Sequence, residues 1–293
     1  MKVLITGGVG MLGSNLAKTL IEQNHEVIIT YNDNEPFFEV KAYKIDIRDG
    51  KVKELIESVS PEWVIHTAAI TNVDLCETDR ELAYSVNVNG TKNVIDGCKK
   101  AGSNLVFVST SFVFDSSREK YSEEDKTNPI NYYAKTKIEA EELTKNSELH
   151  WIIVRPDQIY CWHPFKRNFI TSTLEKFNKK KEFSIFDDWY SSPTYASDLA
   201  KIIITLIEKN EKGIFNTSGP NYLNRFQWAQ KIGNVFEKDA SLVIASKSTE
   251  VNLPAKRPNV KLDLSKIEKV LGRKTIGIEE GLSIMKKEKG DSN

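Results

Sequence analysis

The sequence is poor in the residues that build disulfides and zinc sites, and it carries no excess charge. It has 3 cysteines and 4 histidines in 293 residues, and 41 Lys+Arg balance 41 Asp+Glu. An odd number of widely spaced cysteines is typical of reduced thiols in a cytoplasmic protein. So few histidines give no reason to expect a metal site. The absence of net charge argues against a basic nucleic-acid-binding surface.

Long hydrophobic runs are missing as well. No stretch reaches the roughly 18 consecutive apolar residues of a membrane-spanning helix. The first residues, Met1 and Lys2 followed by VLIT, lead directly into a strand-like segment and not into the apolar core of a signal peptide. We therefore expect a cytoplasmic protein without a membrane partner. With 40% hydrophobic residues, the chain can build a sizeable core.

Short apolar segments alternate with longer amphipathic ones along the first half of the chain. Strands are predicted at 2–6, 26–30, 42–45, 63–67, 105–109 and 151–155, and helices at 11–24, 50–60, 80–101 and 131–145. Apolar strands separated by helices are typical of βαβ units in a parallel sheet buried on both faces. Right-handed crossovers then predict a doubly wound, Rossmann-type α/β fold with ligands at the carboxyl ends of its strands.

The alternation weakens after Arg155, where prolines interrupt short helices and loops. We predict a dinucleotide-binding domain at 1–156, onto which 191–219 packs back with a helix near 197–208. Residues 157–190 and 220–287 are predicted to form a smaller α/β lobe that binds the substrate, and 288–293 a frayed tail. Active sites commonly form between two such lobes.

A glycine-rich turn follows the first predicted strand. The segment 7–13, GGVGMLG, contains the G-x-G-x-x-G spacing at Gly8, Gly10 and Gly13. Glycines allow a tight turn and let a pyrophosphate approach the backbone amides at the start of the next helix. The place of the motif, between a strand and an amphipathic helix, favours a dinucleotide site. The alternative is a glycine-rich turn that binds nothing.

The second predicted strand ends without the residue that usually selects NAD. A carboxylate commonly holds the ribose hydroxyls at this place, but EVIIT is followed by Tyr31 and Asn32, and the first acid is Asp33. No Arg or Lys stands there for a 2′-phosphate either. Because the missing carboxylate removes a repulsion against NADP, NADPH is the predicted cofactor and NAD the alternative. Tyr31 could equally do no more than cover the adenine pocket.

Tyr133 and Lys137 lie four residues apart in a predicted helix and therefore share one face. An ammonium beside a phenol favours the phenolate and tunes the tyrosine as a proton donor. Thr110 ends the strand upstream, where its hydroxyl could hydrogen-bond a substrate oxygen. The structural alternatives are a surface pair for Tyr133 and Lys137 and a strand cap for Thr110. Three acids that follow are expected on solvated helix faces: Glu139, Glu141 and Glu142.

Several long, order-specific segments resemble the extended short-chain dehydrogenase/reductase superfamily and, within it, the dTDP-4-dehydrorhamnose reductases. The segments are TAAITNVDLCE (67–77), AYSVNVNGTKNV (83–94), STSFVFD (109–115), YSEEDKTNPINYYAKTK (121–137), SSPTYASDLA (191–200), GIFNTSGP (213–220) and KRPNVKLD (256–263). The resemblance runs along most of the chain. It implies that Thr110, Tyr133 and Lys137 form the catalytic set and that Asn87 supports the fold around the active site.

The motif and the resemblance together assign the binding residues. Those expected at the cofactor are Gly7, Gly10, Met11, Leu12 and Gly13 at the pyrophosphate, Tyr31 and Asn32 at the end of the second strand, Asp46 and Ile47 near the adenine, Ala68 and Ala69 on the nicotinamide side, and Tyr133 and Lys137. Those expected at the substrate are Ser111, Phe112, Asn168, Trp189 and Arg257.

The chain departs from the reductase pattern at substrate positions. The pattern after Thr110 is Asp-Tyr, and this chain has Ser111-Phe112. The pattern Arg-Thr-Ser after the sixth strand is Arg155-Pro156-Asp157 here, and Trp189 replaces a polar residue. A bound sugar loses about 0.5–1.5 kcal/mol for each ordinary hydrogen bond that such a change removes. The first change also argues against a sugar-nucleotide 4,6-dehydratase, which needs an acid pair there.

The leading hypothesis is NADPH-dependent reduction of the C4 keto group of a nucleotide-activated 4-keto-6-deoxyhexose, as in dTDP-rhamnose biosynthesis, with Tyr133 as proton donor. One alternative is an NAD-dependent sugar-nucleotide epimerase. Another is a non-catalytic regulatory subunit resembling that of methionine adenosyltransferase, which the altered Ser111-Phe112 and Trp189 leave open. The expected partner is a nucleotide sugar, with a homodimer as the assembly considered and no nucleic acid.

Overall fold

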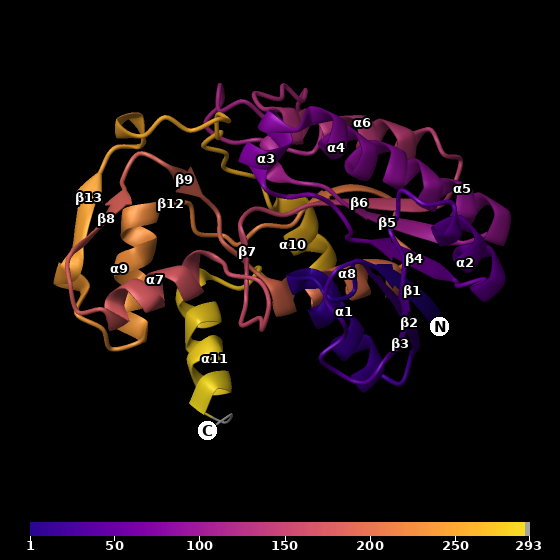
Figure 1. Ribbon diagram of the computed structural model, residues 1–293, viewed down its shortest axis with the longest axis horizontal. Helices are drawn as coiled ribbons and strands as arrows, with labels where there is room; N and C mark the ends of the chain where they lie inside the picture. Colours follow the sequence, from indigo (N-terminus) through magenta and orange to yellow (C-terminus); the bar gives the residue numbers. More distant parts are fainter. Residues whose placement is uncertain (291–293) are drawn as a thin grey trace.

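A seven-stranded sheet forms the centre of the larger part of the protein (Figure 1). The computed structural model describes residues 1–290, with side chains for residues 1–288. Its strands, all parallel, follow the order β11-β6-β5-β4-β1-β2-β3. They are β1 (Lys2–Thr6), β2 (Glu26–Tyr31), β3 (Lys41–Lys44), β4 (Trp63–His66), β5 (Asn104–Val108), β6 (Trp151–Arg155) and β11 (Gly213–Asn216). The order reverses between β1 and β4, the point at which doubly wound sheets bind ligands.

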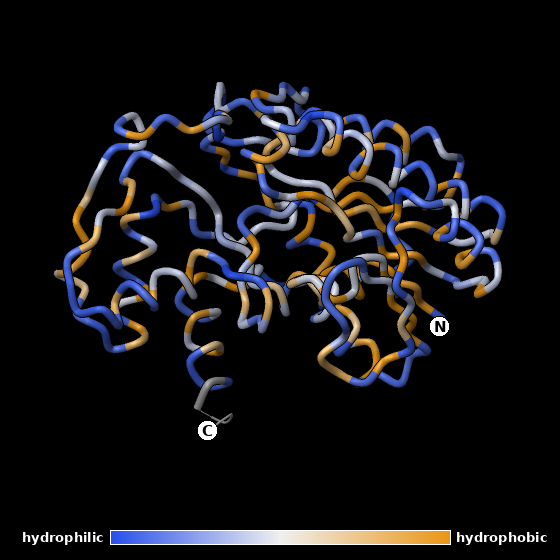
Figure 2. The backbone as a smooth tube through the Cα atoms, in the orientation of Figure 1, coloured by the Kyte–Doolittle hydropathy of each residue, from blue (hydrophilic) through white to orange (hydrophobic). Residues whose placement is uncertain are grey.

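Helices cover both faces of this sheet. On one face lie α1 (Met11–Glu22), α8 (Ala196–Glu208) and α10 (Ser265–Leu271), and on the other α2 (Lys51–Val59), α5 (Thr91–Ala101) and α6 (Tyr132–Lys145). Successive side chains of a strand point to opposite faces. Val3 and Ile5 of β1 therefore pack in the core with α1 and α8, whereas Leu4 packs with α2 and α5. Figure 2 shows the strands as a hydrophobic centre between more polar surfaces.

A second, smaller core lies beside the sheet domain, to its left in Figure 1. Trp228 and Tyr160 pack there with apolar side chains of α7, α9 and α11. The elements of this lobe are β7 (Ile159–Tyr160), α7 (Phe169–Asn178), β8 (Phe183–Phe186), β9 (Tyr190–Ser191), β10 (Thr194–Tyr195), β12 (Leu223–Asn224), α9 (Arg225–Val235), β13 (Val243–Ser246) and α11 (Ile278–Gly290). The exact residues at which one lobe passes into the other stay a prediction.

The helix predicted at 80–101 is three segments. After α3 (Val73–Thr78), α4 (Arg80–Tyr84) leads into a π-helical turn, η1 (Ser85–Gly90), and only then into α5. π-turns inside helices frequently mark functional sites. A short 3₁₀ turn, η2 (Ser111–Val113), follows β5, and two more lie in the smaller lobe, η3 (Ala240–Leu242) and η4 (Ser248–Glu250).

Two further details differ from the sequence prediction. The segment at Gly213–Asn216 was placed on the sheet domain without a strand, and it forms the edge strand β11 beside β6. The tail predicted to fray at 288–293 is helical as far as Gly290, and the Tyr195 hydroxyl donates a hydrogen bond of 2.7 Å to Glu288. Residues 291–293 lie outside the described part. Within that part, no helix is both long and apolar enough to cross a membrane.

Candidate active site

The glycine turn joins β1 to α1 at the carboxyl end of the sheet. Gly7 adopts φ +68°, a left-handed conformation that favours glycine, and its carbonyl accepts a hydrogen bond of 2.9 Å from the Gly10 amide. A Cβ on Gly13 would lie 2.3 Å from the same carbonyl oxygen. Helix α1 begins at Met11 without a side-chain cap, so the amides of its first turn are open to an anion. This turn fits a pyrophosphate.

A cavity of about 340 Å³ opens beside this turn. Eight of the predicted cofactor residues line it: Gly7, Gly10, Tyr31, Asn32, Asp46, Ile47, Ala68 and Ala69. Met11, Leu12 and Gly13 are not among its lining residues, because they open α1 behind the turn. Two cations that the sequence prediction missed also line the cavity, Arg48 and Lys166. Lys166 comes from the smaller lobe, so both lobes contribute to the cavity.

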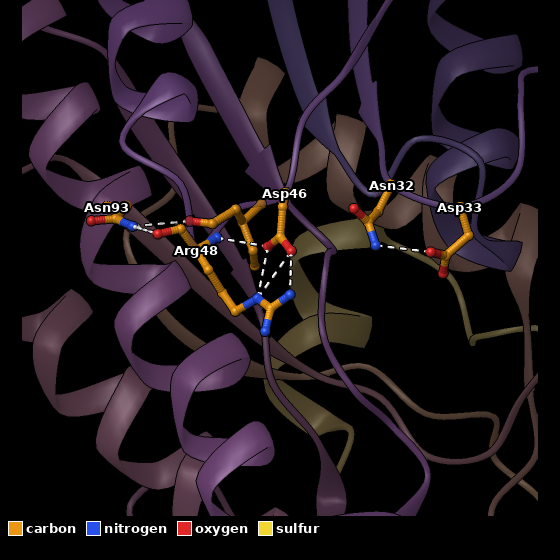
Figure 3. Close-up of polar contacts among 6 residues, drawn as sticks. Asn32, Asp33, Asp46, Arg48 and Asn93 are labelled. Carbon is orange, nitrogen blue, oxygen red and sulfur yellow. Dashed lines mark hydrogen bonds and ion pairs between the residues drawn. The ribbon is translucent and has the colours of Figure 1, made fainter.

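Asp46 and Arg48, which both line this cavity, form an ion pair (Figure 3). The Arg48 guanidinium donates to both carboxylate oxygens, with Nη2 to Oδ2 at 2.5 Å, and this contact lowers the pKa of Asp46. The Asn93 amide donates to the carbonyls of Ile47 and Arg48 at 3.0 and 3.1 Å and so fixes the backbone of this segment. Figure 3 also shows Asn32 and Asp33, where the Asn32 amide donates a hydrogen bond of 2.8 Å to the Asp33 carboxylate.

The three predicted catalytic residues lie close together and are almost fully buried. Tyr133 and Lys137 are on α6, whose N-cap Asn131 accepts a hydrogen bond from the Ala134 amide. Thr110 follows β5 on the neighbouring part of the sheet edge, and the exposed fractions of the three are 7%, 3% and 8%. The Lys137 Nζ lies 4.1 Å from the centre of the Phe107 ring. The alternative of a surface pair for Tyr133 and Lys137 is therefore wrong.

Burial dominates the acid–base properties of these residues. It raises the pKa of Tyr133 above its usual value, and the nearby Thr110 hydroxyl offsets this only in part. Burial lowers the pKa of Lys137 to about 7, opposed by the charge of Glu141. The expectation that the ammonium lowers the pKa of the phenol is not met, because desolvation of the phenolate outweighs it. Thr110 Oγ1 also accepts from the Phe112 amide at 3.2 Å and so caps the η2 turn.

Asn87 connects the catalytic helix to the cavity. Its amide side chain pairs with both backbone groups of Ile70, which lines the cavity, at 2.8 and 3.1 Å. The same side chain donates to Thr136 of α6 at 3.0 Å. Asn87 lies in the π-turn η1, so the irregular helix serves to bring these two segments together. These contacts agree with the supporting role predicted for Asn87.

Glu141 is not on a solvated helix face as predicted, but is wholly buried one turn beyond Lys137. Its carboxylate accepts from Arg155 Nε at 2.9 Å and Nη2 at 2.6 Å, and from the Ser109 hydroxyl at 2.5 Å. The spacing could have revealed this, since residues 133, 137 and 141 repeat every four positions along one helix face. A buried acid on the face of the catalytic pair is expected to have a partner.

A second cavity, of about 350 Å³, lies in the smaller lobe. Its lining includes Gln158, Phe169, Lys176, Trp189 and Arg225. The buried Arg225 guanidinium donates to Gln158 Oε1 at 2.6 Å and lies 4.5 to 4.8 Å from three aromatic rings, those of Phe169, Trp189 and Trp228. Burial lowers its pKa to about 10. A cation among aromatic rings suits an anionic ligand that carries a flat ring.

Of the five predicted substrate residues, only Trp189 lines this second cavity. The Arg257 guanidinium lies 5.2 Å from the Trp189 ring centre while pairing with Asp74 at 2.5 Å. Asn168 caps α7 and donates to the Cys161 carbonyl at 2.6 Å. Two further predicted residues are buried in the sheet domain beside Tyr133: Ser111 and Phe112. Ser111 is fully buried and Phe112 is 5% exposed.

Comparison with known proteins shows to which family the chain belongs. The sequence profile of the RmlD substrate binding domain matches residues 1–289. The chain belongs to the RmlD substrate binding domain family. This family lies in the extended short-chain dehydrogenase/reductase superfamily, as the sequence predicted, and the doubly wound fold of its members matches the sheet described above.

Three similar proteins bear on function. The chain is 28% identical to a dTDP-4-dehydrorhamnose reductase ortholog of Clostridium acetobutylicum, with a TM-score of 0.88 over 99% of this chain and 100% of that one. The dTDP-4-dehydrorhamnose reductase of Bacillus anthracis, solved in complex with NADP, has a TM-score of 0.86 at 28% identity over 98% and 99% of the two chains. Methionine adenosyltransferase 2 subunit beta of Rattus norvegicus is 29% identical over 96% of this chain and 87% of that protein.

Proposed function

We propose that the protein is an NADPH-dependent reductase that acts on the C4 keto group of a nucleotide-activated 4-keto-6-deoxyhexose. The observation that carries this proposal is the buried set of Thr110, Tyr133 and Lys137, tied through Asn87 to the cavity beside the glycine turn. The named reductases among its relatives support the reaction class. A structural role alone does not account for a phenol and an ammonium buried together.

In this proposal each residue has a separate task. A nicotinamide dinucleotide supplies the hydride when it is bound. Tyr133 donates the proton to the C4 oxygen, and the Thr110 hydroxyl polarises that carbonyl by a hydrogen bond. Lys137, whose pKa is lowered to about 7, is partly protonated at neutral pH and stabilises the phenolate that Tyr133 leaves behind. The Glu141 charge beside Lys137 favours this protonated form.

The proposed cofactor site is the cavity beside the glycine turn. The glycine turn would hold the pyrophosphate, and Asp46 and Ile47 would contact the adenine. Arg48 and Lys166 are the cations near enough to a ribose 2′-phosphate to favour NADPH, while NAD stays the alternative. The relative from Bacillus anthracis binds NADP.

The proposed substrate site is the second cavity, in the smaller lobe. Arg225 and Lys176 offer positive charge for a diphosphate, and Trp189 and Phe169 offer flat faces for a base. The Nη1 of Arg225 and the Nε1 of Trp189 are buried without a hydrogen-bond partner among the described residues. Such donors are expected to be satisfied by a ligand or by water.

The test is consumption of NADPH, followed by its absorbance, with dTDP-4-dehydrorhamnose and the corresponding UDP and GDP keto sugars. Tyr133→Phe should lower kcat/KM by about 10²–10⁴-fold and leave NADPH affinity unchanged. Tyr132→Phe is the matched control, because Tyr132 is the adjacent residue of α6 and its ring faces Arg80. Equal loss in both variants, or none in Tyr133→Phe, would refute the role of Tyr133. An epimerase would show turnover without net NADPH consumption.

A second candidate is a regulatory subunit, favoured by the similarity to methionine adenosyltransferase 2 subunit beta. This candidate predicts that the protein binds the dinucleotide yet reduces none of the keto sugars. It also predicts a stable complex with a methionine adenosyltransferase in size-exclusion chromatography. Turnover of any nucleotide keto sugar by the isolated protein would exclude it as the sole function.

A further inference from the structure

A buried carboxylate, Asp157, lies beside the catalytic residues without a task in the proposed reaction. Beyond the ends of β5 and β6 the two chains stay paired, since the Ser111 amide donates to the Pro156 carbonyl at 2.9 Å. Asp157, which follows Pro156, therefore lies next to Ser111. Ser111 in turn directly follows Thr110. Its exposed fraction is 4%. Burying a carboxylate is unfavourable unless its charge is used or fully compensated.

Charged and polar groups from several elements face Asp157. Its Oδ2 accepts from the Ser192 amide at 2.6 Å. The Ser111 hydroxyl and the positive charge of Arg225 both lower its pKa, but burial outweighs them and raises the value to about 6. Its charge in turn raises the pKa of Tyr222 in the smaller lobe. Asp157 is thus close both to Ser111, the neighbour of Thr110, and to Arg225 of the second cavity.

Several donors around Asp157 are unsatisfied. Ser111 Oγ is wholly buried and has no partner within ordinary hydrogen-bond distance among the described residues. Arg225 Nη1 and Trp189 Nε1 are in the same condition. Buried polar groups of native proteins are usually paired. Two of these unpaired donors belong to residues that act on Asp157, namely Ser111 and Arg225, and they point to a polar ligand that completes the arrangement.

The sequence itself links Ser111 and Asp157. The reductase pattern has Asp directly after the catalytic threonine and Ser two residues after the arginine of the sixth strand. This chain has Ser111 and Asp157 at those two positions. The carboxylate and the hydroxyl have exchanged strands, and the paired backbones keep them adjacent. The sequence analysis found no carboxylate at position 111. The Asp157 carboxylate lies beside that position instead, and it comes from the segment after β6.

We propose that Asp157, together with Ser111, is the specificity-determining pair of this cleft, which holds a hydroxyl group of the bound sugar. The inference rests on the proposed function, because it needs a sugar nucleotide in the cleft. A carboxylate accepts a hydrogen bond from a sugar hydroxyl, and the Ser111 hydroxyl donates to its oxygen. Because the paired backbones keep positions 111 and 157 adjacent, a carboxylate at either position would reach the same hydroxyl group.

The test compares ligands with and without the sugar. Calorimetry in the presence of NADPH gives the Kd of dTDP and of dTDP-glucose, with UDP, UDP-glucose, GDP and GDP-mannose in parallel. Asp157→Ser should weaken binding of the cognate sugar nucleotide about tenfold and that of the free nucleotide less than about twofold. The exchange variant S111D/D157S, which restores the reductase pattern, should regain most of the lost affinity. Asp239→Ser, on the exposed η3 turn, is the control and should change neither.

Several outcomes would overturn the inference. One is an unchanged Kd for the sugar nucleotide in Asp157→Ser. Another is equal weakening of nucleotide and sugar nucleotide, which would indicate a general disturbance of the lobe. A third is an exchange variant that binds no better than Asp157→Ser. If Asp157→Ser does not fold, Asp157→Asn and the exchange variant decide by the same comparison.

The same data separate this inference from the proposed function. If the wild-type protein binds none of the nucleotides and sugar nucleotides, the proposed function fails and the inference fails with it. If the wild type binds a sugar nucleotide and Asp157 makes no difference, only the inference fails.

Discussion

Removing the Glu141 carboxylate is expected to destabilise the protein strongly. The side chains of Glu141 and Arg155 are 1% and 2% exposed, and Arg155 Nη1 already lacks a partner among the described residues. Glu141→Ala would leave this guanidinium buried without a counter-ion and would remove the acceptor of the Ser109 hydroxyl. Breaking a buried ion pair on one side costs about 3–5 kcal/mol. We expect the free energy of unfolding to fall by that amount.

The adjacent residue of the same helix provides the control. Glu142 pairs with Lys145 at 2.7 Å, but the two side chains are 54% and 29% exposed. Exposed pairs contribute about 0–1 kcal/mol, so Glu142→Ala should change stability little. Urea unfolding at neutral pH, followed by circular dichroism, measures both variants. If Glu141→Ala and Glu142→Ala differ by less than about 1 kcal/mol, the buried pair does not stabilise the fold as argued.

Glu141 also affects Lys137, to which the proposed function gives a catalytic role. Burial lowers the pKa of Lys137 to about 7, and the Glu141 charge opposes this effect. Glu141→Gln removes the charge, so the pKa of Lys137 should fall further and the ammonium should be lost at a lower pH. The alkaline limb of the kcat profile should then move toward acid. An unshifted profile in a folded Glu141→Gln protein would contradict this electrostatic coupling.

Three further perturbations test the cofactor cavity and the cleft. Gly13→Ala should abolish NADPH binding in fluorescence titrations, because its Cβ would meet the Gly7 carbonyl at 2.3 Å, whereas Gly50→Ala meets nothing within 4 Å and should bind normally. Lys166→Ala should weaken NADPH about tenfold and NADH hardly at all, and equal effects would remove Lys166 from the 2′-phosphate. Asp157→Asn should stabilise the protein by about 3 kcal/mol at pH 7 but not at pH 4. The folded pKa of about 6 exceeds the ordinary 3.8, so the burial penalty grows as pH rises between these values and is absent below both. Urea unfolding at the two pH values would show a constant difference if this is wrong.

The sheet could be predicted from the sequence because its strands are buried on both faces and are therefore apolar throughout. Val3, Leu4 and Ile5 illustrate this, since each is fully buried although they point to opposite sides. The π-turn at Ser85–Gly90 could not be predicted in the same way. It depends on contacts of Asn87 with Ile70 and Thr136, which are 17 and 49 residues away in the chain. Hydrophobic periodicity carries no information about such distant hydrogen bonds.

The residues of the candidate site likewise differ in whether a local sequence pattern could predict them. Tyr133 and Lys137 were predicted because their spacing on one helix is local. Arg48 and Lys166 were missed because a cation for a 2′-phosphate was sought only at the end of the second strand. Lys166 reaches the cavity from the other lobe, which no local pattern reveals. For Glu141 the signal was present in the four-residue spacing from Lys137, but its charge suggested an exposed position.

Three buried ionisable groups of the cleft are shifted toward their neutral forms. The pKa of Lys137 falls to about 7 and that of Arg225 to about 10, while the pKa of Asp157 rises to about 6, with burial as the largest cause in each case. Burial without full compensation lowers stability, so folding alone gives no reason for the three to lie together. A bound diphosphate would supply the partner that Arg225 Nη1 lacks among the described residues. Charged groups that already have fixed positions before a substrate binds need little reorganisation during a reaction. Lys137 lies in the sheet domain and Arg225 in the smaller lobe, so the proposed reaction requires a substrate that reaches both lobes.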